Sequence, residues 1–108
     1  MTKARRCSVG LLAVAQWKLA QVLLRTNGLR SRAAIEVALA ESSRLSREAD
    51  FRLAEPLLCV ERAELARLNG DQATRDRELR EAYSLFIQIG APVPAAEIAK
   101  KLGLATVS

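Results

Sequence analysis

Two pairs of carboxylates have a spacing that suits acid–base chemistry. Glu61 lies three residues before Glu64, and Glu78 lies three residues before Glu81. On a helix this spacing puts both members of a pair on one side, and catalysis would need burial to raise the pKa of one of them. Arginines are interspersed among these carboxylates, so we favour surface ion pairs as the interpretation; they are Arg62, Arg67, Arg75, Arg77 and Arg80.

Other residue types that catalyse reactions are scarce. The sequence has no histidine, which excludes Ser-His and Cys-His nucleophiles and the usual zinc sites. It also has no glycine-rich phosphate-binding motif. Cys7 and Cys59 are far apart, and the apolar run around Cys59 predicts a buried thiol. We therefore expect a protein that is not an enzyme and that needs no cofactor or metal.

The net charge of +5 is unevenly distributed. The first 35 residues contain seven basic residues and no acidic one, whereas the remainder contains ten basic and twelve acidic residues. A basic segment of this kind attracts nucleic acid, an anionic lipid surface or an acidic partner, and it is also typical of a solvated helix face. These alternatives stay open at the level of the sequence.

Residues 1–15 have the outline of a secretory signal, with basic residues, an apolar run and small residues before Gln16. The apolar pattern continues through Trp17, Ala20 and Leu23 at helical spacing, so cleavage after Ala15 would remove half of a helix. We therefore favour a cytoplasmic protein with reduced thiols and keep the signal peptide as the alternative. We expect no membrane span, because Lys18 interrupts the only candidate.

Glycine, proline and capping residues divide the chain into five predicted helices. Asn27-Gly28 and Asn69-Gly70 are strong stops, and Ser31 and Asp71 are good N-caps. Pro56 suits the first turn of the third helix. The helices cover about residues 8–26, 31–49, 56–69, 71–89 and 94–102.

The first four helices are predicted to form two antiparallel hairpins, about residues 8–49 and 53–89, at an offset near 40. Ser31 and Asp71 are 40 residues apart, and three residues of the second helix have like residues in the fourth at the same offset: Leu39, Glu41 and Leu45 against Leu79, Glu81 and Leu85. A helix at about residues 94–103 is expected to cap the second hairpin. Residues 1–108 are therefore predicted to form one all-α domain of repeated hairpins.

The predicted helices carry apolar stripes at steps of three and four residues, as stacked hairpins require. In the second helix the stripe is Ile35, Ala38, Leu39, Ser42 and Leu45. In the fourth helix it is Leu79, Ala82, Tyr83, Phe86 and Ile89.

The stretch from Glu81 to Pro92 (EAYSLFIQIGAP), followed by Ala95, Ala96, Glu97 and Ile98, resembles the closing repeat of tetratricopeptide-like arrays. It is similar to repeats near the C-terminal ends of LuxR-type regulators of the maltose-activator kind and of multidomain class III nucleotide cyclases. The resemblance covers about residues 10–104, although the period is nearer 40 than the strict 34. It implies a piece of a right-handed α-solenoid that binds a protein or peptide, as a terminal fragment of, or partner to, a larger bacterial signalling or transcription-regulatory protein.

In such a scaffold the first helix of each hairpin forms a concave face, which we expect to be the binding surface. Trp17 is expected to pack between helices, with an exposed binding anchor as the alternative. The candidate partner-binding residues are Gln16, Trp17, Lys18, Gln21, Arg25, Arg62 and Arg67. The alternative function is binding of nucleic acid or an anionic surface through the basic N-terminal third.

Both ends of the predicted array raise further expectations. Apolar residues wrap most of the first helix, so we expect it to pack against a second copy, forming a homodimer, or against an upstream domain. Residues 95–108 are similar to the start of a DNA-binding helix-turn-helix, but Val107 follows Gly103 too closely for that pattern. We therefore favour a capping helix there.

Overall fold

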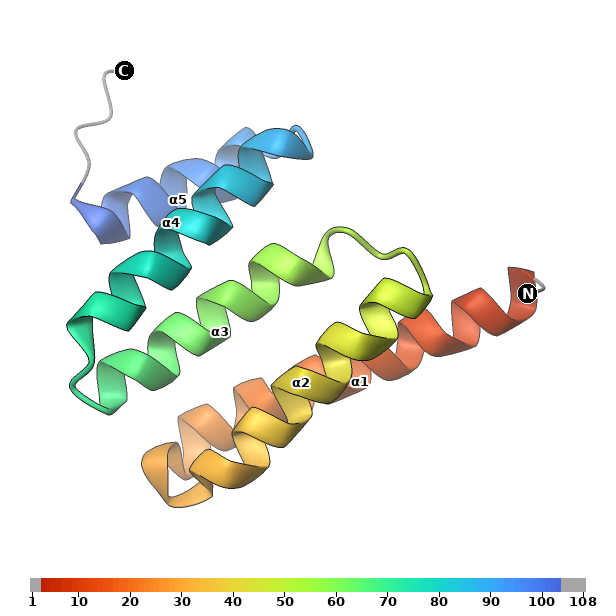
Figure 1. Ribbon diagram of the computed structural model, residues 1–108, viewed down its shortest axis with the longest axis horizontal. Helices are drawn as coiled ribbons and strands as arrows, with labels where there is room; N and C mark the ends of the chain where they lie inside the picture. Colours follow the sequence, from red (N-terminus) through yellow and green to blue (C-terminus); the bar gives the residue numbers. More distant parts are fainter. Residues whose placement is uncertain (1–2, 104–108) are drawn as a thin grey trace.

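The chain folds into helices that are joined by short turns (Figure 1). The computed structural model describes residues 3–103, with side chains described from Ser8 onward. This part of the chain contains no strand, in agreement with the all-α prediction. Its elements are α1 (Lys3–Thr26), the 3-10 turn η1 (Gly28–Ser31), α2 (Arg32–Glu48), α3 (Ala54–Leu68), α4 (Gln72–Gln88) and α5 (Pro92–Leu102).

Three helices begin earlier than the sequence predicted. α3 begins at Ala54 and not at Pro56, so Pro56 is the third residue of its first turn. α1 begins at Lys3 and not near Ser8, because Lys, Ala and Arg are strong helix formers and extend the helix toward the N-terminus. α5 begins at Pro92 and not at Pro94, because a proline is tolerated in the first helical turn, where its missing N–H would be unpaired in any case. The side chain of Cys7 and residues 104–108, which include the end of the helix-turn-helix-like segment, lie outside the described part.

The predicted N-caps differ in their chemistry. Asp71 caps α4: its Oδ1 accepts a hydrogen bond from the backbone N–H of Thr74 at 3.1 Å, and its Oδ2 accepts one from the Thr74 hydroxyl at 2.6 Å. Ser31 is also the N-cap residue, of α2, but its side chain makes no capping bond. Because η1 precedes α2, the Ser31 hydroxyl instead accepts a hydrogen bond from Asn27 Nδ2 at 2.8 Å.

The turn between α3 and α4 shows how the hairpins close. The N–H of Gly70 donates to the carbonyl of Arg67 at 3.1 Å, and the N–H of Asp71 donates to that of Ala66 at 2.9 Å. This pairing requires a left-handed residue after the helix, and Gly70 supplies it with a φ of 74°. At the end of α2 the same position is held by Asp50, with a φ of 55°, which a residue other than glycine adopts at an energetic cost.

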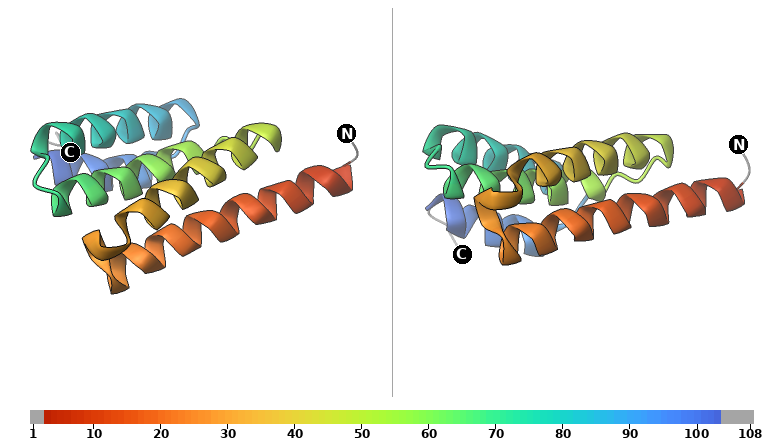
Figure 2. Two further views of the ribbon diagram at one scale, coloured as in Figure 1. Left: turned by 60° about the horizontal axis from the view of Figure 1, so that its bottom comes forward. Right: turned by 90° about the horizontal axis from the view of Figure 1, so that it is seen from below.

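Neighbouring helices run antiparallel and pack in pairs. α1 packs along α2, α3 packs along α4, and α5 packs on α4. The two pairs are joined through α3, which contacts both α1 and α2. The result is a flat molecule with extents of 44 × 35 × 18 Å, in which α1 lies along one edge (Figure 2).

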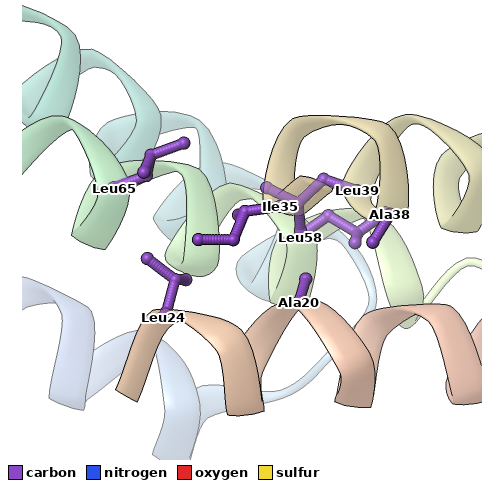
Figure 3. Close-up of a cluster of buried hydrophobic side chains, with 7 residues drawn as sticks. All are labelled: Ala20, Leu24, Ile35, Ala38, Leu39, Leu58 and Leu65. Carbon is purple, nitrogen blue, oxygen red and sulfur yellow. The ribbon is translucent and has the colours of Figure 1, made fainter. Parts of the chain in front are cut away.

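Two large clusters of buried side chains hold the helices together, and a smaller third cluster of Val9, Ala13 and Leu45 joins α1 to α2. Figure 3 shows the first cluster, in which side chains from α1, α2 and α3 point toward one another: Ala20, Leu24, Ile35, Ala38, Leu39, Leu58 and Leu65. The second joins α3, α4 and α5: Cys59, Ala63, Leu79, Ala82, Phe86, Ala95 and Ile98. Leu58 and Cys59 are adjacent in α3, yet each belongs to a different cluster.

The burial pattern confirms most of the predicted stripes. All five residues of the α2 stripe are buried, including Ser42, whose hydroxyl donates to the carbonyl of Ala13 at 2.7 Å. In the α4 stripe, Ile89 is an exception because it is the C-cap residue and is exposed. Among the described helices, none combines the length and the hydropathy that a bilayer crossing requires.

Candidate functional site

A hollow of about 820 Å³ opens between α1 and α3, and α4 and α5 close one end of it. We call it the basic groove. Its lining combines apolar, basic and acidic side chains: Trp17, Gln21, Leu24 and Arg25 of α1; Leu57, Val60, Glu61, Ala63, Glu64, Arg67 and Leu68 of α3; Arg75 and Leu79 of α4; and Lys101 of α5.

Trp17 forms part of the apolar wall of the groove. Its ring packs against the first core cluster, which fits the prediction of an inter-helix residue, while one side of it remains accessible. The Lys18 Nζ lies 4.8 Å from the ring centroid, a cation–π distance. The Trp17 Nε1 is buried, and it has no hydrogen-bond acceptor among the residues that the structure describes.

Four basic side chains surround this apolar wall, and they come from four helices. Arg67 donates from Nε to Glu64 Oε2 at 3.0 Å, and Arg75 donates from Nη2 to the carbonyl of Lys101 at 3.0 Å. The side chains of Arg25 and Lys101 have no hydrogen bond or ion pair to any other side chain within residues 8–103. Two of the four cations that line the groove are thus held in position by hydrogen bonds, and the other two are unpaired among the described residues.

The two carboxyls of the groove lie in different environments. The hydrogen bond from Arg67 lowers the pKa of Glu64, so that this side chain is ionised. Glu61 is buried, and desolvation raises its pKa against the opposing effects of the Gln21 hydrogen bond and of Arg25. The Gln21 Nε2 donates to Glu61 Oε1 at 3.3 Å. The pKa values of the two carboxyls are therefore displaced in opposite directions.

The prediction of surface ion pairs holds for Glu64 and is wrong for Glu61. Glu64 pairs with Arg67 one turn away. Glu61 faces α1, where Gln21 is its hydrogen-bond partner, because the helix turns it toward the buried side. The geometry offers no nucleophile beside Glu61, and the described residues contain no cluster of His, Cys, Asp and Glu that could hold a metal ion.

The structure brings only some of the predicted binding residues together. Trp17, Gln21, Arg25 and Arg67 line the groove, and Lys18 lies at its rim over Trp17. Gln16 and Arg62 do not line it. Each is five residues from a groove residue, Gln21 or Arg67, and a step of five on a helix rotates a side chain by about 140°.

Arg62 instead lines a second hollow, of about 310 Å³, between α2, α3 and the start of α4. This hollow is on another face of α3, so Arg62 and Arg67 cannot contact the same ligand segment in the groove.

Sequence reasoning missed Arg75 and Lys101. The prediction used only the first helix of each hairpin, whereas Arg75 belongs to α4 and Lys101 to α5. The excess of lysine at the end of the fifth helix was the available signal for Lys101, but only tertiary packing places it beside α3.

Cys59 is buried as predicted. Its thiol lies in the second core cluster, and burial raises its pKa to about 12. A thiol with this pKa is protonated at neutral pH and is a poor nucleophile.

Comparisons with known proteins found no matching family model, no matching curated protein and no matching solved structure.

Proposed function

We propose that this chain is a tetratricopeptide-like protein-interaction module that binds an acidic peptide segment in the basic groove. The observation that supports it is the composition of the groove, where four cations from four helices surround an apolar wall. Binding pockets combine apolar walls with a few placed polar groups in this way. In this proposal the hairpins α1–α2 and α3–α4 are two repeats and α5 is the cap.

The geometry favours a peptide over a rigid ligand. The groove is lined by residues of both hairpins, and Trp17, Leu57 and Leu68 offer it apolar surface that side chains of a peptide can contact. Arg25 of α1 and Lys101 of α5 both line the groove, and neither forms an ion pair within the described residues. We propose that the module serves a larger bacterial signalling or transcription-regulatory protein, either as part of it or as its partner, and that it has no catalytic activity.

The test is a titration with a short peptide of alternating glutamate and leucine. Trp17 is the only tryptophan and lines the groove, so its emission reports binding directly. The double variant Arg67→Gln/Lys101→Gln removes one cation that Glu64 holds in position and one unpaired cation from the groove. A loss of about 0.5–1 kcal/mol for each weakens binding by roughly five- to thirtyfold.

The matched control is Arg30→Gln/Arg80→Gln, which removes the same charge from exposed positions outside the groove. We expect its affinity for the peptide to match that of the unmodified chain. Equal losses in the two double variants would show that the peptide responds to net charge and not to the groove.

The second candidate function is binding of nucleic acid through the same cations. It is favoured if a single-stranded oligonucleotide binds more tightly than the peptide at low salt and its affinity falls steeply as salt rises. Binding of nucleic acid through cations is driven by the release of counterions and does not need an apolar surface. The apolar wall of the groove therefore favours the peptide, whose leucine side chains can contact it.

A further inference from the structure

α1 has a second apolar face that no other described helix covers. The side buried in the core carries Val9, Ala13, Ala20 and Leu24. The opposite side carries Leu11, Leu12, Ala15, Leu19 and Val22, which we call the outer stripe. Four of these are strongly exposed: 71% for Leu11, 54% for Leu12, 47% for Leu19 and 52% for Val22.

The outer stripe is continuous and is too large to be incidental. Single exposed apolar residues are common on protein surfaces, but contiguous patches mark interaction sites. The stripe extends from residue 11 to residue 22, about 16 Å along the helix. A helix that is apolar on opposite sides is typical of one that is buried on both, and α1 contacts only α2, α3 and η1 within the described chain, along its inner side. It lies along the edge of the molecule in both views of Figure 2.

The spacing of the stripe suits a helix as the occupant. Leu12, Ala15, Leu19 and Val22 are separated by three, four and three residues, which is the spacing of a knobs-into-holes seam. Ala15, in the middle of the seam, allows a second helix to approach closely.

Charge identifies the chemistry of that helix. The sequence of α1 contains five basic residues and no acidic one. Lys18 and Arg25 lie at the boundary between the outer stripe and the basic groove: the Lys18 Nζ donates to Gln21 Oε1 at 3.2 Å, and Arg25 lines the groove. The edge of the stripe that borders the groove is therefore its basic edge. A second copy of this chain would bring two basic helices together without any carboxylate to pair with them. A partner helix with acidic residues would supply carboxylates that pair with the basic residues of α1.

A lipid surface is a poorer match than a helix. Helices that lie on membranes usually carry Trp or Phe on the apolar side. The outer stripe has neither, because Trp17 is turned inward to the groove.

We propose that the outer stripe of α1 docks an amphipathic helix of a partner protein, with acidic residues flanking the apolar side of that helix. This site lies on the side of α1 away from the core, whereas the proposed peptide site is the basic groove. The two sites share Lys18 and Arg25 at their boundary, whereas the apolar residues of the stripe do not line the groove.

The test uses a synthetic helical peptide with leucine at the seam positions and glutamate at the flanking positions. Its matched counterpart carries lysine at the flanking positions. We expect calorimetry to show one-to-one binding of the glutamate peptide, at least tenfold tighter than that of the lysine peptide.

The decisive variant is Leu12→Gln/Leu19→Gln, in which both side chains are already exposed and the core is untouched. Burial of two leucines is lost, so we expect binding to weaken by more than about tenfold. Val37→Gln/Val93→Gln is the control, since Val37 and Val93 are 69% and 73% exposed on other helices. It should bind as the unmodified chain does, and so should the groove variant Arg67→Gln/Lys101→Gln.

Four results would overturn the proposal. The first is failure of the glutamate peptide to bind, and the second is equal binding of the two peptides. The third is sedimentation of the chain alone as a dimer that Leu12→Gln/Leu19→Gln dissociates, which would make a second copy the occupant. The fourth is tighter binding to phosphatidylserine vesicles than to the peptide, with loss of this binding in the same variant, which would make lipid the occupant.

Failure of the groove proposal alone would appear only in the Arg67→Gln/Lys101→Gln titration with the glutamate–leucine peptide.

Discussion

Glu61 and Glu64 are three residues apart in α3 and lie in opposite electrostatic environments. Burial beside α1 raises the pKa of Glu61, whereas Arg67 lowers the pKa of Glu64. The neutral form of Glu61 and the ionised form of Glu64 are therefore the forms that the folded state favours. Stability should respond to pH with opposite signs at the two positions.

Glu61→Gln tests this directly. A carboxyl whose pKa is raised by folding contributes stability at pH values below its unfolded pKa, near 4.5, and this contribution is lost as the pH rises through the folded pKa. Glutamine keeps the neutral form at every pH. We expect the variant to have a higher urea midpoint than the unmodified chain at neutral pH, with the difference shrinking at acidic pH.

Glu64→Gln is the matched control. Its carboxylate stabilises the fold above its unfolded pKa, so this variant should have the lower midpoint at neutral pH, and the difference should again shrink in acid. If the two variants shift the midpoint in the same direction at neutral pH, the assignment of opposite environments is wrong.

At the scale of single residues, the sequence predicted the burial of an apolar side chain better than the burial of a charged one. The buried thiol of Cys59 followed from its apolar neighbours. The burial of Glu61 did not, because its local pattern is the same as that of Glu64 and only the position of Gln21 on another helix distinguishes the two.

At the scale of the helices, the capping residues make unequal contributions. The Asp71 carboxylate accepts two hydrogen bonds at the start of α4, and these bonds lower its pKa. Ser31 occupies the same position before α2 without bonding to the helix backbone. Asp71 and Ser31 occupy the same N-cap position, but only Asp71 stabilises its helix through a capping hydrogen bond.

We expect Asp71→Ala to lower the urea midpoint more than Ser31→Ala does. Asp71→Ala removes a cap, whereas Ser31→Ala removes one exposed side-chain bond to Asn27. Because the pKa of Asp71 is lowered in the folded state, its contribution is present above the unfolded pKa and is lost as the pH falls through the folded value. The effect of Asp71→Ala should therefore diminish in acid, and that of Ser31→Ala should not change. Equal effects of the two variants at neutral pH would contradict the assignment.

Most helix boundaries were predictable because they depend on local chemistry. The predicted stops at Gly28 and Gly70 are left-handed residues, as the sequence indicated. The errors occurred at helix starts where the preceding residues also tolerate a helical conformation, at Lys3, Ala54 and Pro92. The 3-10 turn before Ser31 is a tertiary outcome, since α3 packs against it.

At the scale of the whole molecule, the groove was predictable in part. The sequence indicated Trp17, Gln21 and Arg25 on one helix face. It could not place Lys101 beside Arg75, since these residues are 26 positions apart and meet only because α5 folds back on α4. The repeat pattern also predicted that Arg62 belongs to the binding face. In the structure, Arg62 lies on the opposite side of α3 from the groove.

The two core clusters share α3, so unfolding of one should accompany unfolding of the other. Leu58 is fully buried in the first cluster, and Leu58→Ala should lower the free energy of unfolding by about 2–5 kcal/mol. Urea unfolding followed by Trp17 fluorescence and by far-ultraviolet circular dichroism should shift together, as a single cooperative transition requires.

Val37→Ala is the control for this experiment, because Val37 is exposed and its truncation should change stability by no more than about 0.5 kcal/mol. A circular-dichroism transition that stays in place while the Trp17 transition moves would show that the two clusters unfold independently.

The central position of α3 also has a consequence for sequence variation. Eight of its fifteen residues are buried, whereas α4 buries three of seventeen. In a library of single substitutions, α3 should therefore be the segment least tolerant of change, and α4 should accept most replacements on its outer side. Over evolutionary time such a chain diverges unevenly, with α3 preserving the fold while the surface of α4 drifts.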